Sequence, residues 1–234
     1  MKTSVIAHRG AWKEFNFPQN SLAALKKAIA LNCYACEIDV HLTNDGFVVV
    51  NHDYDFYDLP IETTNYNVLK QNKLSNGEHL PLLIDFFSEI NKQYNTKLLV
   101  EIKTSILNPK NRTQLLIDTI VNQLPKDTYS ENTEFILFDF ESALYLKRVL
   151  PFFKVHYLEG DKSAQEIFQN GLNGMDYNFE LLLQNSEIIT EFNQLNLQTN
   201  SWTINDLNVA KTLKSKGLSY ITTDLPSLFI NEGL

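Results

Sequence analysis

The sequence has 234 residues, of which 44% are hydrophobic and 21% are charged, a composition typical of a soluble globular protein. This length is sufficient for one large domain with a substantial core, and α/β barrels commonly reach it undivided. The formal net charge is −8, and we find no basic tract and no group of aromatic residues interleaved with arginines. This argues against nucleic acid as the main partner.

The amino-terminal residues lack the apolar stretch of a signal peptide. No segment approaches the roughly 20 apolar residues that span a bilayer. We therefore expect a cytoplasmic protein without stable membrane insertion. Cys33 and Cys36 form a Cys-x-x-Cys pair that follows a predicted helix instead of opening one, so we expect inert thiols and no redox pair.

Short apolar segments alternate with amphipathic segments along the whole chain, which is typical of parallel α/β folds. The predicted strands cover residues 4–7, 35–40, 47–51, 98–103, 134–138, 154–158, 174–177, 198–203 and 220–223. A first helix begins after Asn20 or Ser21, either of which can cap it. Further helices are predicted over residues 83–94, 112–124, 142–149, 164–170, 187–195 and 207–215.

The alternation predicts a (β/α)8 TIM barrel formed by a single domain, residues 1–234. Nine strands are one too many, and the turn Asn44-Asp45-Gly46 indicates that the surplus strand forms a hairpin. Residues 53–82, after the strand that ends at His52, form a short irregular excursion. A doubly wound open sheet is the alternative, but it would usually show a glycine-rich loop after the first strand.

Polar residues gather at the carboxyl ends of the first four predicted strands, where the functional groups of barrels collect. Because side chains alternate along a strand, those two residues apart project from the same face. In chain order these residues are His8 and Arg9, Glu37 and Asp39, His52, and Glu101 and Lys103. We therefore expect them to surround one site.

Glu37, Asp39 and Glu101 lie in otherwise apolar strands, and buried carboxylates require a cation as partner. Three carboxylates without a cluster of histidine or cysteine favour Mg²⁺ or Ca²⁺ over Zn²⁺. The alternative is an ion pair of Lys103 with Glu101 or Glu37 that closes the barrel without metal.

His8 and His52 fit an acid–base pair, in which one takes a proton from a nucleophile and the other protonates a leaving oxygen. A single histidine at the end of a strand is more often structural. Arg9 and Lys103 supply positive charge for an anionic group such as a phosphate. Together these residues predict metal-dependent hydrolysis of a phosphate ester.

Several motifs resemble the glycerophosphodiester phosphodiesterase family. They are residues 6–10 (IAHRG), 18–21 (PQNS), 37–46 (EIDVHLTNDG), 48–53 (VVVNHD), 80–82 (LPL), 100–103 (VEIK), 201–205 (SWTIN) and 221–226 (ITTDLP). The resemblance implies a barrel with Glu37, Asp39 and Glu101 as metal ligands and with His8 and His52 as acid–base residues. It further implies that Arg9 and Lys103 contact phosphate and that Trp202 packs beside the substrate. The expected products are sn-glycerol 3-phosphate and an alcohol.

Three departures from the family pattern concern the substrate. The family usually has Glu at the position of Gln19, and Asp139 stands where a Ser is common. The excursion is shorter and carries a different sequence. A diesterase for another polyol phosphate, as in a capsule or wall precursor, is therefore one alternative.

Two further alternatives remain. A lysophospholipase D-like activity would use the aromatic side chains of Phe15, Phe17, Phe56 and Tyr57 on predicted rim loops. A catalytically silent phosphate-binding domain is disfavoured by the intact acidic and histidine positions. The sequence carries no signal for an oligomeric state.

Overall fold

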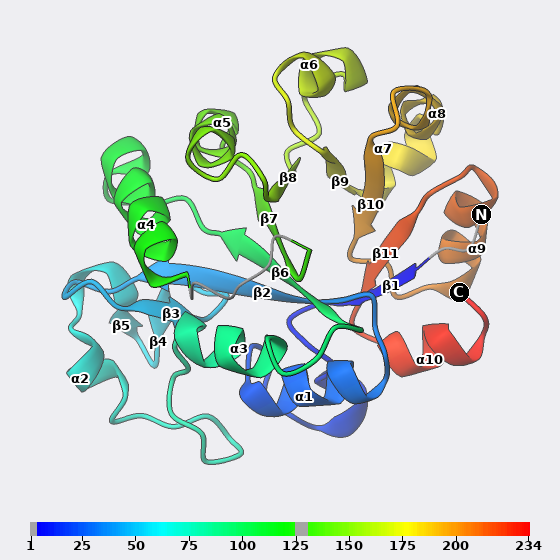
Figure 1. Cartoon of the computed structure of the whole chain (residues 1–234). Coiled ribbons are helices and arrows are strands. Elements are labelled where there is room, and N and C mark those ends of the chain that lie inside the picture. The colour runs from blue at the N-terminus through cyan, green and yellow to red at the C-terminus, as the bar shows by residue number, and fades with distance from the viewer. Residues whose placement is uncertain (1–3, 125–130) are drawn as a thin grey trace.

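The computed structural model describes residues 4–124 and 131–234. Within them, eight parallel strands form a closed barrel, because β1 pairs with both β2 and β11 (Figure 1). The strands are β1 (Ser4–Ala7), β2 (Ala35–Leu42), β6 (Lys97–Ile102), β7 (Thr133–Leu137), β8 (Lys154–Tyr157), β9 (Gly174–Asn178), β10 (Gln198–Trp202) and β11 (Tyr220–Thr223). This confirms the predicted (β/α)8 barrel.

The surplus strand predicted over residues 47–51 is β3 (Val48–Val50), which pairs antiparallel with β2 outside the barrel. The two strands are joined by the turn at Asp45-Gly46, in which Gly46 has a φ of +85°. Glycine adopts this left-handed conformation without a steric penalty. The hairpin therefore accounts for the surplus strand.

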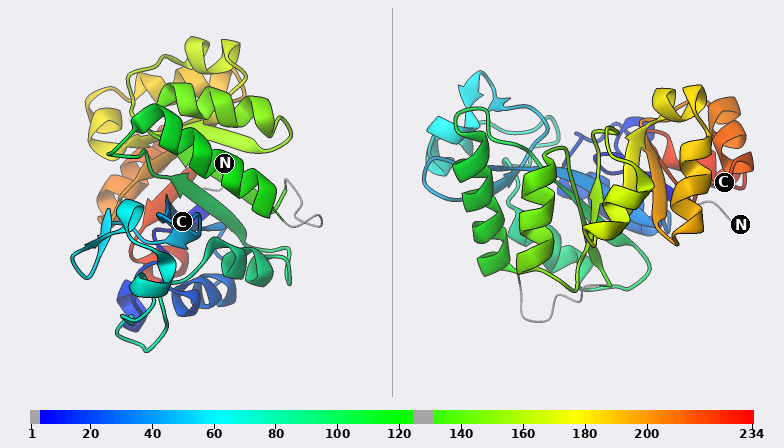
Figure 2. Two further views of the ribbon diagram at one scale, coloured as in Figure 1. Left: turned by 90° about the vertical axis from the view of Figure 1, so that its left-hand side faces the viewer. Right: turned by 90° about the horizontal axis from the view of Figure 1, so that it is seen from above.

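Helices cover the outside of the barrel in every view (Figures 1 and 2). They are α1 (Leu22–Ala30), α3 (Leu83–Ile90), α4 (Pro109–Gln123), α5 (Phe140–Val149), α6 (Ala164–Gln169), α7 (Phe179–Gln184), α8 (Glu187–Gln194), α9 (Leu207–Ser215) and α10 (Pro226–Asn231). The sequence did not predict α7 and α10, which have six residues each. Helix α1 begins after Ser21, whose hydroxyl accepts a hydrogen bond from the amide of Ala24.

The excursion is less irregular than predicted. It contains a small hairpin of β4 (Asp55–Phe56) and β5 (Leu59–Pro60), a 3₁₀ turn at Ile61–Thr63, and α2 (Tyr66–Leu69). Its apolar side chains form a small core of their own around Ile61 and Leu80. Side chains fasten it to the barrel at several points: Arg112 of α4 donates to the carbonyls of Leu42, Thr43 and Glu62, and Glu78 accepts from the amides of Leu22 and Ala23 in α1.

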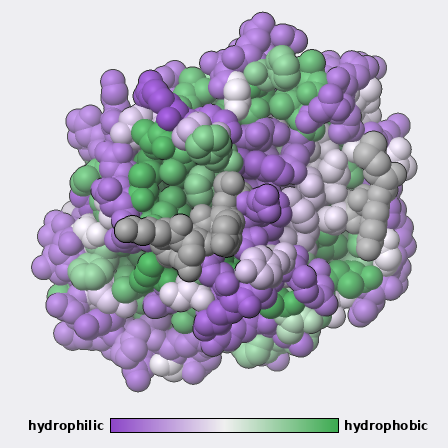
Figure 3. All heavy atoms as spheres, in the orientation of Figure 1, coloured by the Kyte–Doolittle hydropathy of each residue, from purple (hydrophilic) through white to green (hydrophobic). Residues whose placement is uncertain are grey.

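The main hydrophobic core lies between the strands and the surrounding helices, and a smaller cluster fills the inside of the barrel. The face shown in Figure 3 is largely hydrophilic with separate apolar patches.

At the amino-terminal end of the barrel, buried Glu134 accepts hydrogen bonds from Lys97, Tyr34 and His156. No helix in the two described ranges is long and apolar enough to cross a membrane.

Candidate active site

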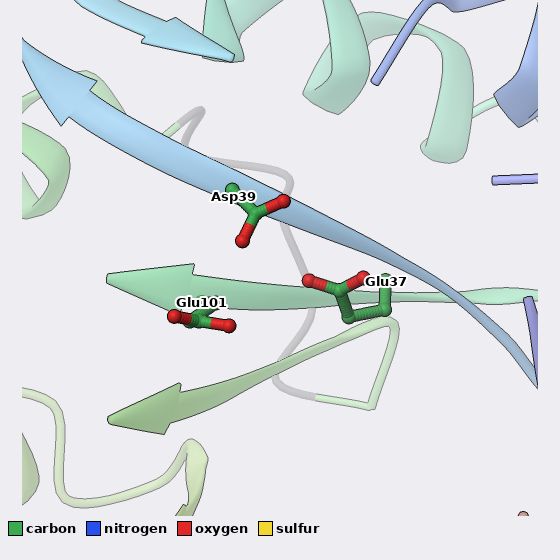
Figure 4. A group of neighbouring side chains, drawn as sticks. All are labelled: Glu37, Asp39 and Glu101. Carbon is green, nitrogen blue, oxygen red and sulfur yellow. The ribbon is translucent and has the colours of Figure 1, made fainter. Parts of the chain in front are cut away.

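Three buried carboxylates converge inside the barrel (Figure 4). Glu37 and Asp39 project from the same face of β2, and Asp39 pairs in register with Glu101 on the adjacent β6. One carboxylate oxygen from each residue lies within 4.8 Å of the others. Glu37, Asp39 and Glu101 are only 2%, 1% and 9% exposed, respectively. The structure thus brings the three predicted ligands together.

Lys103 forms ion pairs with two of these carboxylates. Its Nζ lies 2.8 Å from Asp39 Oδ1 and 2.5 Å from Glu101 Oε1. The predicted alternative of a Glu101–Lys103 ion pair is therefore present, whereas no pair with Glu37 is found in the described residues. One ammonium group cannot balance three carboxylates, so the cluster keeps an excess of negative charge.

The loop after β1 brings Arg9 to the same cluster. Arg9 has a φ of +55°, unusual for a residue with a side chain, and its amide donates to Glu37 Oε2 at 2.7 Å. Its Nη1 donates to Gln19 Oε1 at 2.9 Å, and its Nε lies 3.6 Å from Asp39. Gly10 follows with a φ of +84°, and a Cβ there would lie 2.6 Å from that of Ala24. The His-Arg-Gly sequence thus fits a tight turn against α1.

Asn20 holds Asp39 from the other side. Its Nδ2 donates to Asp39 Oδ2 at 2.8 Å, and its Oδ1 accepts from the Asp39 amide at 3.2 Å. The sequence analysis considered Asn20 only as a helix cap, a role that Ser21 fills. Both atoms of this amide instead fix the orientation of one carboxylate.

The carboxylates differ in acidity. Burial and the neighbouring Asp39 and Glu101 raise the pKa of Glu37 well above its ordinary value. Burial, then Asp39, raises the pKa of Glu101 to about 7. Burial would also raise the pKa of Asp39, but Lys103 and Asn20 outweigh it and lower that pKa. Without a further cation the cluster therefore favours partial protonation.

His8 is paired with the carboxylate of Asp224, the residue that directly follows β11. Its Nδ1 lies 2.7 Å from Asp224 Oδ1, and Asp224 Oδ2 accepts from Asn205 at 2.8 Å. Because a carboxylate only accepts, the proton of neutral His8 lies on Nδ1 and Nε2 keeps its lone pair. Burial opposes it, but the contact with His8 lowers the pKa of Asp224 to about 2. Sequence reasoning assigned no role to Asp224, although it follows a predicted strand.

His52 lies at the mouth of the site, after β3. Its Nδ1 is 2.7 Å from Asp53 Oδ1, and its side chain is 34% exposed. Burial lowers its pKa. Behind it, His41 Nε2 lies 3.2 Å from the His52 carbonyl, which requires that Nε2 donates. His41 is buried, and continuing the alternation of Glu37 and Asp39 by two residues would have found it.

These groups surround a cavity of about 220 Å³. Opposite the charged side, Phe138 and Trp202 meet edge to face, with ring centroids 5.7 Å apart, and Trp202 Nε1 donates to the Asp176 carbonyl. Asp39 lies behind the lining, and the other seven predicted site residues line the cavity. The full lining is His8, Arg9, Glu37, His52, Glu101, Lys103, Ile136, Phe138, Leu158, Asp176, Trp202, Thr203 and Thr222.

The model of the glycerophosphoryl diester phosphodiesterase family matches residues 8–228. The chain belongs to this family. It is therefore a phosphoric diester hydrolase of the glycerophosphodiester phosphodiesterase type, and the alternative of a silent binding domain is not retained.

Phosphodiesterases of known structure or name match the chain over nearly its whole length. The crystal structure of a glycerophosphodiester phosphodiesterase from Parabacteroides distasonis is 32% identical with a TM-score of 0.94, covering 99% of this chain and 97% of that one. A curated one from Caldanaerobacter subterraneus is 27% identical over 99% of this chain and 98% of its own length. An Oleispira antarctica phosphodiesterase, solved with the product sn-glycerol-3-phosphate, shares the fold at 24% identity and a TM-score of 0.79, covering 98% and 96%.

Two residues that departed from the pattern of the family have clear contacts. Gln19 accepts from Arg9, as described above. Asp139 accepts a hydrogen bond from the Ser142 amide at 2.8 Å and caps α5. Since Asp139 does not line the cavity, it gives no support to a different substrate.

The aromatic residues proposed for lipid contact mostly pack within the protein. Phe56 is buried in the small core of the excursion, and the Phe15 ring lies 4.0 Å from Lys27 Nζ. Tyr57 is 58% exposed, but its hydroxyl donates to the Lys73 carbonyl. A lysophospholipase D-like activity stays a prediction without support from these contacts.

Proposed function

We propose that this enzyme hydrolyses water-soluble glycerophosphodiesters to sn-glycerol 3-phosphate and an alcohol, with His8 and His52 as the acid–base pair. The observation that carries the proposal is one cavity that collects buried carboxylates, two cationic side chains and two histidines, each with a carboxylate partner. A phosphodiesterase of the same fold holds this product.

A divalent cation fits the carboxylate cluster. Glu37 Oε1 is buried without a hydrogen-bond partner in the described residues, and the three carboxylates outnumber Lys103. An all-oxygen donor set suits Mg²⁺ or Ca²⁺, held by Glu37, Asp39 and Glu101. When bound, the cation would withdraw charge from a phosphoryl oxygen and favour loss of the proton of a nearby hydroxyl.

His8 and His52 each carry out one of the two proton transfers, His8 as the base and His52 as the acid. Asp224 keeps the proton of His8 on Nδ1, so that Nε2 is free to take a proton from the attacking hydroxyl. If this hydroxyl is water, the products form directly; if it is the substrate alcohol next to the phosphate, a cyclic phosphate forms first and water then opens it. His52 lies nearer the mouth of the cavity, where it gives a proton to the leaving oxygen. After the reaction each histidine carries the proton state that the other began with, and exchange with water restores both.

The remaining side chains hold the substrate. Arg9 and Lys103 contact the phosphate oxygens, with the fork of Arg9 suited to two oxygens at once. Phe138 and Trp202 pack against the carbon skeleton. Because Gln19 is neutral, the positive charge of Arg9 is less balanced here than it would be beside a glutamate.

The test is turnover of glycerophosphocholine by enzyme stripped with EDTA and then supplied with Mg²⁺ or Ca²⁺ singly. We expect activity to return with one of them, and His8→Ala and His52→Ala to lose at least about a hundredfold in kcat. His79→Ala is the matched control, since His79 lies in the excursion, its Nδ1 contacts the Lys70 carbonyl and it does not line the cavity. Equal activity with and without metal would refute the metal role, and near-native turnover would remove that histidine from the mechanism.

A diester of another polyol phosphate is the second candidate, favoured by Gln19 beside Arg9. Replacing a carboxylate with an amide lets the site accept a substrate with more negative charge. Comparing kcat/KM for glycerophosphocholine and for glycerol- or ribitol-phosphate diesters decides between the two. A strong preference for glycerophosphocholine ends the second candidate.

A further inference from the structure

One polar side chain in the cavity has no part in the phosphate chemistry. Asp176 lies on β9 and lines the cavity, and it is only 2% exposed. Its Oδ1 has no hydrogen-bond partner among the described residues. A buried carboxyl oxygen without a partner costs free energy, so such an atom in a binding cavity calls for a ligand group.

The surroundings of Asp176 supply no cationic partner: burial raises the pKa of its carboxyl to about 8, and contact with the Asn200 side chain opposes this only in part. Asn200, its neighbour in register on β10, donates to the Thr222 hydroxyl at 2.9 Å, and Thr222 also lines the cavity. Trp202 Nε1 donates to the Asp176 carbonyl at 2.8 Å. In the described part of the chain no Lys, Arg or His forms an ion pair with Asp176, whereas Lys103 pairs with Asp39 and Glu101.

The missing partner can be identified by elimination. A phosphate oxygen only accepts and carries negative charge, so it does not satisfy an ionised carboxylate; a protonated carboxyl would donate to it, but in the proposed function Arg9 and Lys103 take the phosphate oxygens. An alkyl group has no hydrogen to donate. A hydroxyl donates to the carboxyl whether Asp176 is ionised or protonated, and polyol hydroxyls accompany the phosphate in the proposed substrates.

The geometry points to Asp176 as a specificity-determining residue that accepts a hydrogen bond from a hydroxyl of the substrate's polyol portion. This inference rests on the proposed function. In this arrangement the carboxylate cluster with its divalent cation, together with Arg9 and Lys103, would bind the phosphate group. Asp176 would distinguish a polyol from an alkyl chain. A site that holds a hydroxyl this way rejects an analogue without it, because the carboxyl is left unpaired.

A different role for Asp176 must be separated from this one. A second cavity of about 10 Å³, large enough for one water molecule, lies on another side of Asp176 and is also lined by Gln198 and His156. If Oδ1 only accepts a hydrogen bond from a water molecule in that second cavity, Asp176 has a structural role. Its replacement would then change the affinity for every ligand alike.

The experiment compares the affinities of sn-glycerol 3-phosphate and propyl phosphate by calorimetry. Asp176→Leu removes the hydrogen bond at similar volume, and Asp176→Asn retains it. Thr133→Val is the matched control, because Thr133 is fully buried with an unpartnered hydroxyl but does not line the cavity. Thermal unfolding of each variant reports on the fold.

We expect the wild type, Asp176→Asn and Thr133→Val to prefer glycerol phosphate by about tenfold, the equivalent of one hydrogen bond. In Asp176→Leu the preference should fall to about one while propyl phosphate binds as before. An unchanged preference in Asp176→Leu, equal losses for both ligands, or no preference in the wild type would each overturn the inference. A preserved pattern of binding in an enzyme that cleaves no glycerophosphodiester would refute the proposed reaction and leave the role of Asp176 standing.

Discussion

The contact between His8 and Asp224 makes a sharp prediction for Asp224→Asn. In the native site, Asp224 Oδ1 accepts from His8 Nδ1, while Asn205 Nδ2 donates to Asp224 Oδ2 at 2.8 Å and Lys13 Nζ lies 3.4 Å from that same oxygen. Two donors therefore hold the Oδ2 position, so the amide oxygen of the variant must occupy it. The amide nitrogen is then left facing His8.

This orientation reverses the tautomer of His8. An amide nitrogen donates, so His8 Nδ1 must accept and the proton moves to Nε2. Nε2 can then no longer act as a base. General base catalysis contributes about 10² to 10⁴ in rate, so we expect kcat/KM to fall by this factor, roughly 3 to 5 kcal/mol of transition-state stabilisation.

The assay is kcat/KM on glycerophosphocholine across pH, together with ¹⁵N NMR of the imidazole nitrogens to identify the tautomer. Lys13→Met is the control, because it removes a contact to the same carboxylate from a side chain that is 49% exposed. That variant should remain within about threefold of the wild type, as expected for a solvent-screened ion pair. Native-like kcat/KM in Asp224→Asn, with the proton shown to lie on Nε2, would refute the assignment of His8 as the base.

Four further outcomes follow from contacts already described. His41→Leu should lower kcat about tenfold and His41→Gln much less, since only the glutamine can still donate to the His52 carbonyl; equal losses in steady-state kinetics would count against this positioning role. Gly10→Ala should destabilise the fold by about 3 kcal/mol in urea titrations, against about 1 kcal/mol for Gly77→Ala, which has a similar φ of +87° but nothing within 4 Å. Arg112→Met should cost about 3 kcal/mol, because three carbonyls lose their donor; a loss below about 1 kcal/mol would show that the excursion does not need this contact. The lowered pKa of Asp224, about 2 in the folded state, means that its stabilisation is fully present above about pH 4 and is lost as the pH falls to about 2. The loss should be roughly 2 kcal/mol by acid titration and should be missing from Asp224→Asn.

Periodicity within one strand placed two of the three carboxylates, and the rule that functional groups gather at the carboxyl ends of barrel strands placed the third near them. Glu37 and Asp39 were placed on one face from their spacing, and the register between β2 and β6 brings Glu101 beside them. The surplus strand was likewise predicted from the Asp45-Gly46 turn. These features depend on residues close together in sequence or on neighbouring parallel strands, where simple rules apply.

Other features depend on how the barrel closes. His8 and Asp224 are 216 residues apart, and they meet only because β1 pairs with β11. For Lys103 the sequence suggested phosphate or an ion pair with Glu101 or Glu37, whereas its partner on β2, Asp39, follows from a register that the sequence does not specify. Helix α10 was missed because six residues are too few to show a helical period, although Pro226 at its first turn is a typical start signal.

The attachment of the excursion has a consequence for how this enzyme can change. Val49 and Val50 lie against Leu82 and Pro81, so the chain leaves β3 and returns at almost the same place. The cost of closing such a loop rises only slowly with its length. Asn51 Nδ2 donates to the carbonyls of Asp53 and Asp55, so the turn that carries His52 and its partner Asp53 is fixed by contacts within residues 51–55. We therefore expect changes of length after Asp55 to leave His52 in place. The start of the excursion thus belongs to the part that performs the reaction, and Glu78 near its end accepts from the amides of Leu22 and Ala23 in α1, so variation in length is expected between these two anchored ends.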